Sequence, residues 1–247
     1  MILIFGAMLT AAPSPSPSPD PCGGTHSNLL AVLDRPSIGY SPCAAKPHET
    51  VVEAGYSNAA GASGLLATYP QGFIRYGAAR NLEVDVLANG RFDSGIGAKY
   101  EWWHDDTRAF ATDFLYTVPT GGAAFTAGGP IATVNADYAF PLSSRFGFAA
   151  TLGAQSSYAA ALNGSAGRFF SLLPSFVVSD QWNPRAQAFV ELYGQTRTRP
   201  DGGALLGSDA AFQYILAPQL ELDLEMGRTA NDVTRSHYVG FGFGARF

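Results

Sequence analysis

Acidic residues in this sequence recur at every second position within short segments. Glu221, Asp223 and Glu225 alternate with leucines and a methionine, and Glu83 and Asp85 alternate with leucine and valines. Side chains two residues apart on a strand lie on the same face. On the inner wall of a closed sheet, such acids would favour cations or neutral solutes over anions. The alternative is that they pair with other groups and solvate a plugged interior.

The charged residues expected to face the interior are mostly acidic. The predicted pore-lining residues are Arg75, Glu83, Asp85, Lys99, Glu101, Asp113, Asp137, Glu191, Asp209, Glu221, Asp223 and Glu225. Glu53 and Arg246 share their phase. With these two, eleven acids face three bases, and this excess is the basis of the predicted cation preference.

Apolar side chains share the inward phase on several segments. The predicted apolar track consists of Phe73, Leu115, Leu173, Val177, Phe189 and Tyr193. Sites for small hydrophobic molecules are lined by such side chains, so these residues suit an aromatic solute. Ordinary packing of the interior is the alternative.

The residues that catalysis would need are not grouped in the sequence. His26 and His48 precede the predicted sheet, His104 lies in a predicted turn, and His237 follows Ser236 in a predicted outer loop. Solvated histidines explain this distribution better than a general base. Acids spaced by two on a strand suit a lumen lining better than a glycosidase pair. We therefore expect no enzymatic activity, no cofactor and no metal site, and a Ser236/His237 hydrolase is the weakest hypothesis.

Cys22 and Cys43 are the two cysteines of the chain. In a chain exported to an oxidising compartment, an even pair at this separation favours a disulfide. A zinc site is disfavoured because no pair of histidines stands nearby at ligand spacing. A lipid anchor is disfavoured because Cys22 lacks the small-residue context that lipidation requires. The prediction is a Cys22–Cys43 disulfide.

Strands must carry any membrane crossing, because no apolar run reaches the roughly eighteen residues of a spanning helix. A sheet in hydrocarbon has to pair every backbone group, which closes it into a barrel. We therefore predict an all-β fold, a closed antiparallel transmembrane β-barrel of about twelve strands. The predicted strands are 50–58, 66–77, 82–89, 94–103, 108–118, 131–140, 146–157, 168–179, 186–196, 205–216, 220–228 and 237–247.

The connections alternate in length. Joints at 78–81, 104–107, 141–145, 180–185 and 217–219 are short, whereas 119–130 and 158–167 are longer. Outer-membrane barrels have short periplasmic turns and longer outer loops. Aromatic residues beside the short turns are expected to form an interfacial girdle: Tyr76, Trp102, Phe110, Phe140, Phe146, Trp182, Tyr214 and Phe247. The alternative architecture is a secreted antiparallel β-sandwich.

Composition and the N-terminal residues indicate export. The 247-residue chain has 14% charged residues and a net charge of −5. Because the sequence has no stripe of basic residues, we expect no nucleic-acid partner. Residues 1–12 are apolar and end in small residues, as a signal peptide does. They lack a Lys or Arg near Met1, which suits a truncated leader or a misplaced start. Residues 13–48 are expected to form a Pro/Ser linker and a periplasmic segment, and 49–247 the barrel. In one hypothesis residues 22–48, held by the disulfide, partly occlude the lumen.

Several stretches in a fixed order resemble a known family. They are LDRPSIGYSPC (33–43), VVEAGYSN (51–58), RYGAARNLEVDVL (75–87), GIGAKYEW (95–102), VPTGGAAFTAGG (118–129) and LAPQLELDLEMGRTAND (216–232). Through them the chain resembles the transporter-like outer-membrane family described as putative MetA-pathway of phenol degradation. The resemblance implies an outer-membrane channel for small, often hydrophobic or aromatic compounds, without a catalytic residue.

These observations lead to a functional hypothesis. We expect a channel of the bacterial outer membrane through which small hydrophobic or aromatic compounds diffuse passively; a non-transporting structural or adhesive barrel is the alternative. Expected partners are the solute, outer-membrane lipid and the barrel-assembly machinery, whose recognition signal the C-terminal Phe247 resembles. Arginines near the predicted outer rim suit lipopolysaccharide phosphates, although a merely solvated rim is equally compatible: Arg168, Arg197, Arg199, Arg228 and Arg235.

Overall fold

The structure is a computed structural model that describes residues 21–22, 29–61, 64–88, 93–122 and 126–247. For residues 61 and 64–71 the backbone alone is described. The predicted leader, 1–12, and the Pro/Ser tract up to residue 20 lie outside the described residues. Within the described ranges no helix is long and apolar enough to span a membrane.

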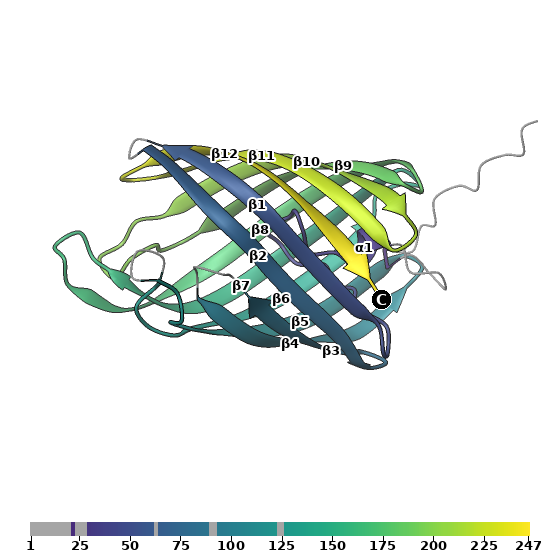
Figure 1. Cartoon of the computed structure of the whole chain (residues 1–247), viewed down its shortest axis with the longest axis horizontal. Helices are drawn as coiled ribbons and strands as arrows, with labels where there is room; N and C mark the ends of the chain where they lie inside the picture. The colour runs from purple at the N-terminus through teal and green to yellow at the C-terminus, as the bar shows by residue number, and fades with distance from the viewer. Residues whose placement is uncertain (1–20, 23–28, 62–63, 89–92, 123–125) are drawn as a thin grey trace, which may run out of the picture.

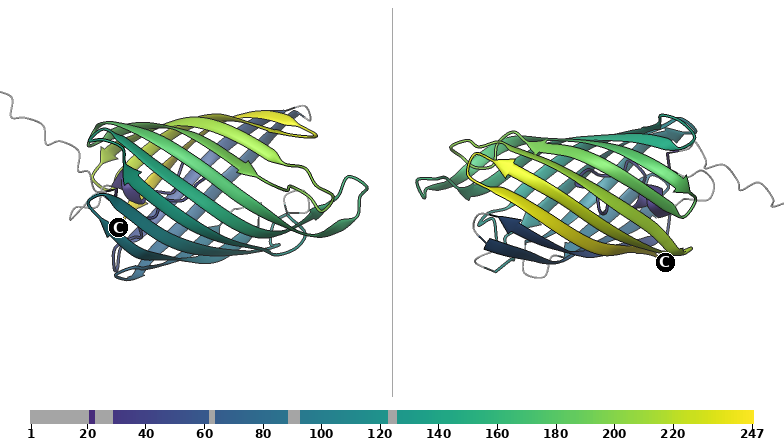
Figure 2. Two further views of the ribbon diagram at one scale, coloured as in Figure 1. Left: turned by 180° about the vertical axis from the view of Figure 1, so that it is seen from behind. Right: turned by 90° about the horizontal axis from the view of Figure 1, so that it is seen from above.

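Twelve strands of the described chain form one closed antiparallel barrel, seen from three sides in Figure 1 and Figure 2. They are β1 (Thr50–Gly61), β2 (Gly64–Ala79), β3 (Leu82–Ala88), β4 (Ser94–Asp105), β5 (Arg108–Val118), β6 (Ile131–Pro141), β7 (Phe146–Ala160), β8 (Ala166–Asn183), β9 (Ala186–Gln195), β10 (Leu205–Ala217), β11 (Leu220–Asn231) and β12 (Arg235–Arg246). Each strand pairs with its neighbours in sequence, and β1 pairs with β12 to close the ring. The predicted fold class and strand number are confirmed.

The two ends of the barrel differ, as the sequence predicts. At one end, here called the turn end, joints of two to four residues connect β2 to β3, β4 to β5, β6 to β7, β8 to β9 and β10 to β11. The other end, the loop end, carries the longer connections 119–130 and 196–204. Thr50 and Phe247 exchange backbone hydrogen bonds of 3.0 and 2.8 Å, so the barrel closes at the turn end.

The sheet sorts its side chains by polarity. On β11, Glu221 and Asp223 are 0% and 3% exposed, whereas Leu222 and Leu224 are 43% and 59% exposed. The charged side chains therefore face the lumen, and the apolar ones face outward. This inverts the arrangement of a soluble protein and matches a hydrocarbon environment. The β-sandwich alternative is wrong, because the sheet closes on itself and buries its charged face.

Strand ends at the turns differ from the prediction in a regular way. Register shifts interrupt the pairing next to four of the five turns, at Gly77/Ala79, Glu101/Trp103, Gln181/Asn183 and Ile215/Ala217. An extra residue in one strand breaks the alternation that the sequence analysis relied on. For this reason the predicted turns 78–81, 104–107 and 180–185 were too long, and the strands run further. The shift on β4 also leaves both Trp102 and Trp103 exposed, at 55% and 41%.

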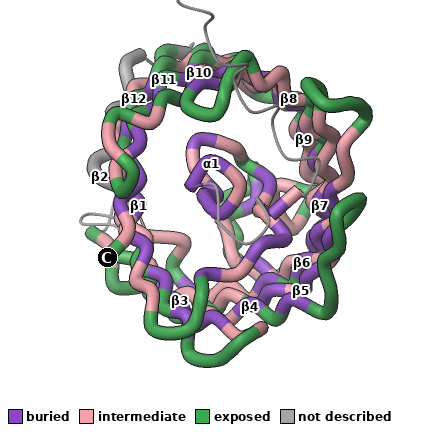
Figure 3. The backbone as a smooth tube through the Cα atoms, turned by 90° about the vertical axis from the view of Figure 1, so that its right-hand side faces the viewer, coloured by how far each residue is buried: buried purple, intermediate pink, exposed green. Residues whose placement is uncertain are grey.

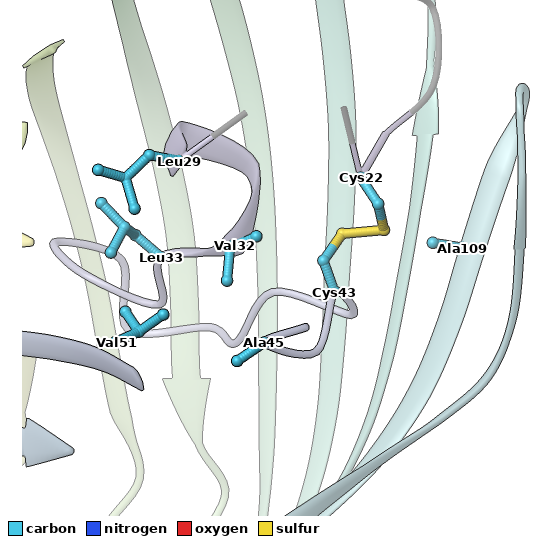
Figure 4. Close-up of a cluster of buried hydrophobic side chains, with 8 residues drawn as sticks. All are labelled: Cys22, Leu29, Val32, Leu33, Cys43, Ala45, Val51 and Ala109. Carbon is cyan, nitrogen blue, oxygen red and sulfur yellow. A yellow bond between two sulfur atoms is a disulfide. The ribbon is translucent and has the colours of Figure 1, made fainter. Parts of the chain in front are cut away.

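The chain that precedes β1 lies inside the barrel. Residues 29–48, here called the plug, begin with the short helix α1 (Leu29–Val32) and lie within the ring of strands near the turn end (Figure 3). A disulfide joins Cys22 to Cys43, with 5.5 Å between the two Cα atoms (Figure 4). The disulfide therefore closes a covalent loop that includes residues 29–43 of the plug.

A small apolar cluster anchors the plug to the wall. Leu29, Val32 and Leu33 pack with the disulfide, and Val51 and Ala109 contribute from the barrel (Figure 4). These wall residues are fully buried. The one apolar core of the described chain thus lies between plug and barrel rather than between two sheets.

The outward face generates a first prediction. Leu224→Arg places a charge in the apolar outer band and should lower the free energy of unfolding by about 2–4 kcal/mol if the position lies near the bilayer midplane. The measurement is equilibrium unfolding from phospholipid vesicles, followed by tryptophan fluorescence. Val233→Arg, in the loop between β11 and β12, is the matched control and should change stability little. Equal effects of the two substitutions would contradict the assigned orientation.

Candidate functional site

Four carboxylates of the barrel wall hold the plug by its backbone. Asp34 N and Arg35 N donate to Glu53 (3.1 and 2.7 Å), Ile38 N and Gly39 N donate to Glu191 (2.8 Å each), Ala44 N donates to Glu101 (3.0 Å), and Ala45 N donates to Glu83 (2.6 Å). The four acceptors come from β1, β9, β4 and β3, so the contacts reach around the barrel. A hydrogen bond to a charged group contributes about 1.5–3 kcal/mol. The wall carboxylates thus bind the plug through its backbone amides.

Arg75 on β2 connects the wall to the plug. Its side chain is completely buried and lies 2.7 Å from Glu53 and 2.8 Å from Glu83. The same guanidinium donates to the backbone oxygens of Val32 (2.5 Å) and Cys43 (3.3 Å), two plug residues that are far apart in the segment. Five fixed donors allow one arginine to serve two carboxylates and two carbonyls at once. Removing one partner of such a buried pair costs about 3–5 kcal/mol.

Lys99 on β4 supplies the second buried cation. Its Nζ lies 3.1 Å from Asp34 of the plug and 3.8 Å from Glu83. Asp34 in turn lies 3.3 Å from Arg75 and accepts a hydrogen bond from Ser41 N at 2.7 Å. Arg75 and Lys99 supply the positive charge, and the plug amides supply hydrogen bonds. Together they stabilise the acids of this region, which would otherwise repel one another.

Inward glycines make room for the plug on β1 and β12. Arg35 lies against Gly55 and Gly242 and reaches Asp223 at 3.2 Å. A Cβ at Gly242 would lie 2.7 Å from the backbone oxygen of Ala54 and 2.6 Å from Arg35 Nη2, so a larger residue would clash with the sheet itself. Leu33 covers Gly244 in the same way. Glycine and phenylalanine alternate near the C-terminus because the phenylalanines face outward and the glycines face inward. The inward Gly242 and Gly244, here called the glycine seat, leave room for the plug side chains.

Residues 37–40 of the plug contact β7, β8 and β9. Glu191 accepts hydrogen bonds from Ser37 Oγ at 3.1 Å and, at short distance, from Ser175 Oγ on β8. Tyr40 N donates to Thr151 Oγ1 on β7 at 3.0 Å. Burial raises the pKa of Tyr40, and the nearby Asp113 raises it further. The phenol group therefore stays neutral at physiological pH.

All the predicted pore-lining residues lie on the inner wall, where each is at most 8% exposed. Six of them bond plug residues: Arg75, Glu83, Lys99, Glu101, Glu191 and Asp223. The others form no hydrogen bond or ion pair with a described plug residue, namely Asp85, Asp113, Asp137, Asp209, Glu221 and Glu225. Half of the predicted set thus serves the plugged state, and cation preference of an open pore stays a prediction.

The predicted apolar track divides between separate strands. Leu173 and Val177 on β8 and Phe189 and Tyr193 on β9 lie on paired strands, whereas Phe73 and Leu115 lie on β2 and β5. Phe189 and Tyr193 are buried, and the other four side chains are half-buried. On the paired strands the four apolar side chains lie on either side of Ser175 and Glu191, the latter of which holds the plug. Phe73 and Leu115 do not join them.

Sequence reasoning missed the residues that the plug itself contributes. Asp34, Arg35 and Ser37 bond the wall, and the glycine seat at Gly242 and Gly244 receives the plug. A signal was present, because the stretch from Leu33 to Cys43 carried the family resemblance and the last strand has glycine at every inward position from 240 to 244.

The described residues offer little for catalysis or metal binding. Ser236 and His237 belong to β12 rather than to a loop, so they point to opposite faces of the sheet and cannot act as a pair. This corrects the predicted loop position. Cys22, Glu101 and His104 approach one another, but the sulfur of Cys22 is in the disulfide and Glu101 accepts from Ala44.

The fold and the site define a class: a closed transmembrane barrel with an internal plug. The sequence pattern of the family described as "Putative MetA-pathway of phenol degradation" matches residues 34–247. The chain belongs to this family. The match begins at Asp34, inside the plug, so residues 34–48 of the plug are part of the family's pattern. Comparison with curated proteins gives no match.

Solved structures of outer-membrane proteins share the fold. An outer membrane channel from Pseudomonas putida F1 superposes with a TM-score of 0.63 at 12% identity, over 87% of this chain and 100% of that one. The NanC porin gives a TM-score of 0.55 at 12% identity, over 78% and 98% of the two chains. The KdgM porin gives 0.54 at 10% identity, over 80% and 99%. At these identities the likeness establishes the fold.

The amide–carboxylate contacts generate a second prediction. Glu191→Ala removes the acceptor of Ile38 N and Gly39 N, so exchange of these amide hydrogens should accelerate at least tenfold. Hydrogen exchange of the plug, read by mass spectrometry in detergent, measures this. Gln155→Ala on β7, whose side chain bonds Thr133 and Ser157, is the matched control. Unchanged exchange in the Glu191 variant would show that the plug is held by other means.

Proposed function

We propose that the protein is a channel of the bacterial outer membrane through which small hydrophobic or aromatic compounds diffuse passively, and that the plug controls the lumen. The observation that carries the proposal is a set of four inward apolar side chains on β8 and β9, on either side of the site where non-covalent contacts hold the plug in the lumen. These four side chains face the lumen of a channel-type barrel. Membership of the family and the fold of outer-membrane channels support the same conclusion.

The contacts of the plug indicate how the lumen would open. Between residues 29 and 48 the plug meets the wall through hydrogen bonds, ion pairs and apolar contacts, and its disulfide is internal to the N-terminal segment. No covalent bond joins it to a strand other than the chain itself at Thr50. Opening therefore requires only that these contacts exchange for water or for a solute, without rearrangement of the sheet.

The proposal includes the surroundings of the barrel. The outward apolar band fits outer-membrane lipid, and the exposed Phe247 fits recognition by the assembly machinery. Arg199 at the loop end already pairs with Asp232 (2.6 Å) and Asp201 (2.9 Å). Lipopolysaccharide phosphates would have to compete with these carboxylates, so the other rim arginines are the better candidates. We propose no catalytic role.

A non-transporting structural or adhesive barrel is the second candidate. The observation that favours it is the density of contacts around Arg75 and the plug amides, which would suit a permanently closed lumen. The two candidates differ in one measurable respect. A channel lets solute pass when the plug is loosened, and a permanently closed barrel does not.

Loosening the plug from its own side tests the proposal. Arg35→Ala removes the ion pair with Asp223 and empties the glycine seat, while the barrel stays unchanged. We expect larger ionic conductance in planar bilayers and faster influx of N-phenyl-1-naphthylamine, an uncharged aromatic dye, into cells that carry the variant. Lys46→Ala is the matched control, since it makes the same charge change at the exposed end of the plug. A variant that conducts no current and admits no dye would favour the closed-barrel candidate.

A further inference from the structure

Four consecutive strands bring two tyrosines and two acids together on the inner wall. Tyr193 on β9, Asp209 on β10, Glu225 on β11 and Tyr238 on β12 are here called the tyrosine–carboxylate cluster. Tyr238 Oη donates to Asp209 Oδ2 at 2.8 Å, and the two tyrosine hydroxyls lie 3.1 Å apart. Because the Tyr238 proton is directed at the carboxylate, Tyr193 donates to Tyr238. The lone pairs of Tyr193 Oη then remain available to a donor in the lumen.

Glycines of the neighbouring strands fix the orientation of the cluster. The Tyr193 ring lies over Gly207, and the Tyr238 ring lies over Gly227. The Glu225 side chain lies over Gly240, the inward position on β12 that follows Tyr238. These three side chains therefore run along the wall rather than across the lumen.

The two acids of the cluster have no cation of their own. Asp209 is 6% exposed, and its Oδ1 has no hydrogen-bond partner. Glu225 is 8% exposed and forms no hydrogen bond or ion pair with the described residues. Arg35, the described cation whose charge acts on Glu225, is bonded to Asp223. An uncompensated carboxylate at such burial is costly, so the cluster is complementary to a positive charge.

Other unpartnered acids of the lumen lie beside the plug. Asp113 and Asp137 have Tyr40 as their neighbour, and Glu221 has Arg35. The cluster differs because it combines free carboxylate oxygens with two aromatic rings and a free phenol oxygen. The next inward residue of β8 beyond the partner of Tyr193 is Leu173, which is apolar and half-buried.

This chemistry favours an organic ammonium ion over a metal ion. Calcium and magnesium require about six or more oxygen ligands, whereas the cluster offers few oxygens and two ring surfaces. An ammonium group has three donors, which match Asp209 Oδ1, a Glu225 oxygen and Tyr193 Oη, and aromatic rings attract cations. Leu173 and the ring faces would contact the hydrocarbon part of the molecule.

We propose that the tyrosine–carboxylate cluster binds the ammonium group of small organic amines, aromatic amines in particular. The proposal rests on the proposed function, since it names a class of solute for the same lumen. It makes the channel selective among aromatic compounds of equal size, in the order cation before neutral alcohol before carboxylate.

Binding to the full-length protein tests this without transport. Benzylammonium, benzyl alcohol and benzoate share one ring size and are titrated calorimetrically into the protein in detergent micelles. We expect benzylammonium to bind at least tenfold more tightly than the other two, because its hydrogen bonds to carboxylates are charge-assisted. The double variant Asp209→Asn/Glu225→Gln should lose at least tenfold in affinity for benzylammonium. Asp105→Asn, at the exposed end of β4, removes an equivalent acid and should change nothing.

The remaining outcomes overturn the proposal. They are absence of benzylammonium binding, equal affinity for benzyl alcohol, full displacement by an equal concentration of potassium, or unchanged affinity in the double variant. Tyr193→Phe guards against a folding defect in the double variant, since it keeps the ring and removes one acceptor; it should weaken benzylammonium and leave benzyl alcohol unaffected. Failure of the proposed function is distinguishable, because it appears as unaltered dye influx and conductance in Arg35→Ala whether or not benzylammonium binds.

Discussion

The structure depends on hydrogen bonds between wall carboxylates and plug amides. Closing twelve strands leaves a lumen that side chains do not fill by themselves. The chain fills part of it with its own N-terminal segment, whose backbone must be hydrogen-bonded once it is removed from water. Glu53 and Glu191 each accept two plug amides. The same acids would repel one another in an empty barrel, so plug and wall stabilise each other.

This mutual dependence explains the charge pattern of the chain. At the plugged end Asp34, Glu53 and Glu83 are balanced by Arg75, Lys99 and backbone donors, and the plug is held firmly. Nearer the loop end, Asp209 and Glu225 have no such partners. One inner surface thus has two parts, of which the first fixes the plug and the second is left for a positively charged group.

Much of the fold was predictable from the sequence because a strand that faces lipid on one side and a polar lumen on the other must alternate. The inward placement of Glu221 and Asp223 followed from this rule alone. The alternation rule did not predict the bulges near the turns, as at Trp103, because one extra residue interrupts the alternation locally. The contacts of the plug escaped it too, since the segment has no periodicity and its partners lie far away in sequence. The sequence indicated that Gly242 faces inward, but it did not indicate that Gly242 accommodates the Arg35 side chain.

Crosslinking the plug to the wall tests the central claim most directly. A Cβ at Gly39 would lie 3.3 Å from Ser175 Cβ, close to the separation in a disulfide. In Gly39→Cys/Ser175→Cys protein reconstituted in bilayers, mild oxidation should yield the linked peptide by mass spectrometry in most molecules. The pair Gly39→Cys/Ser236→Cys, with its second cysteine at the loop end, should not link. Absence of the first link, or equal formation of both, would show that the plug does not rest on β8 and β9 and would contradict the account.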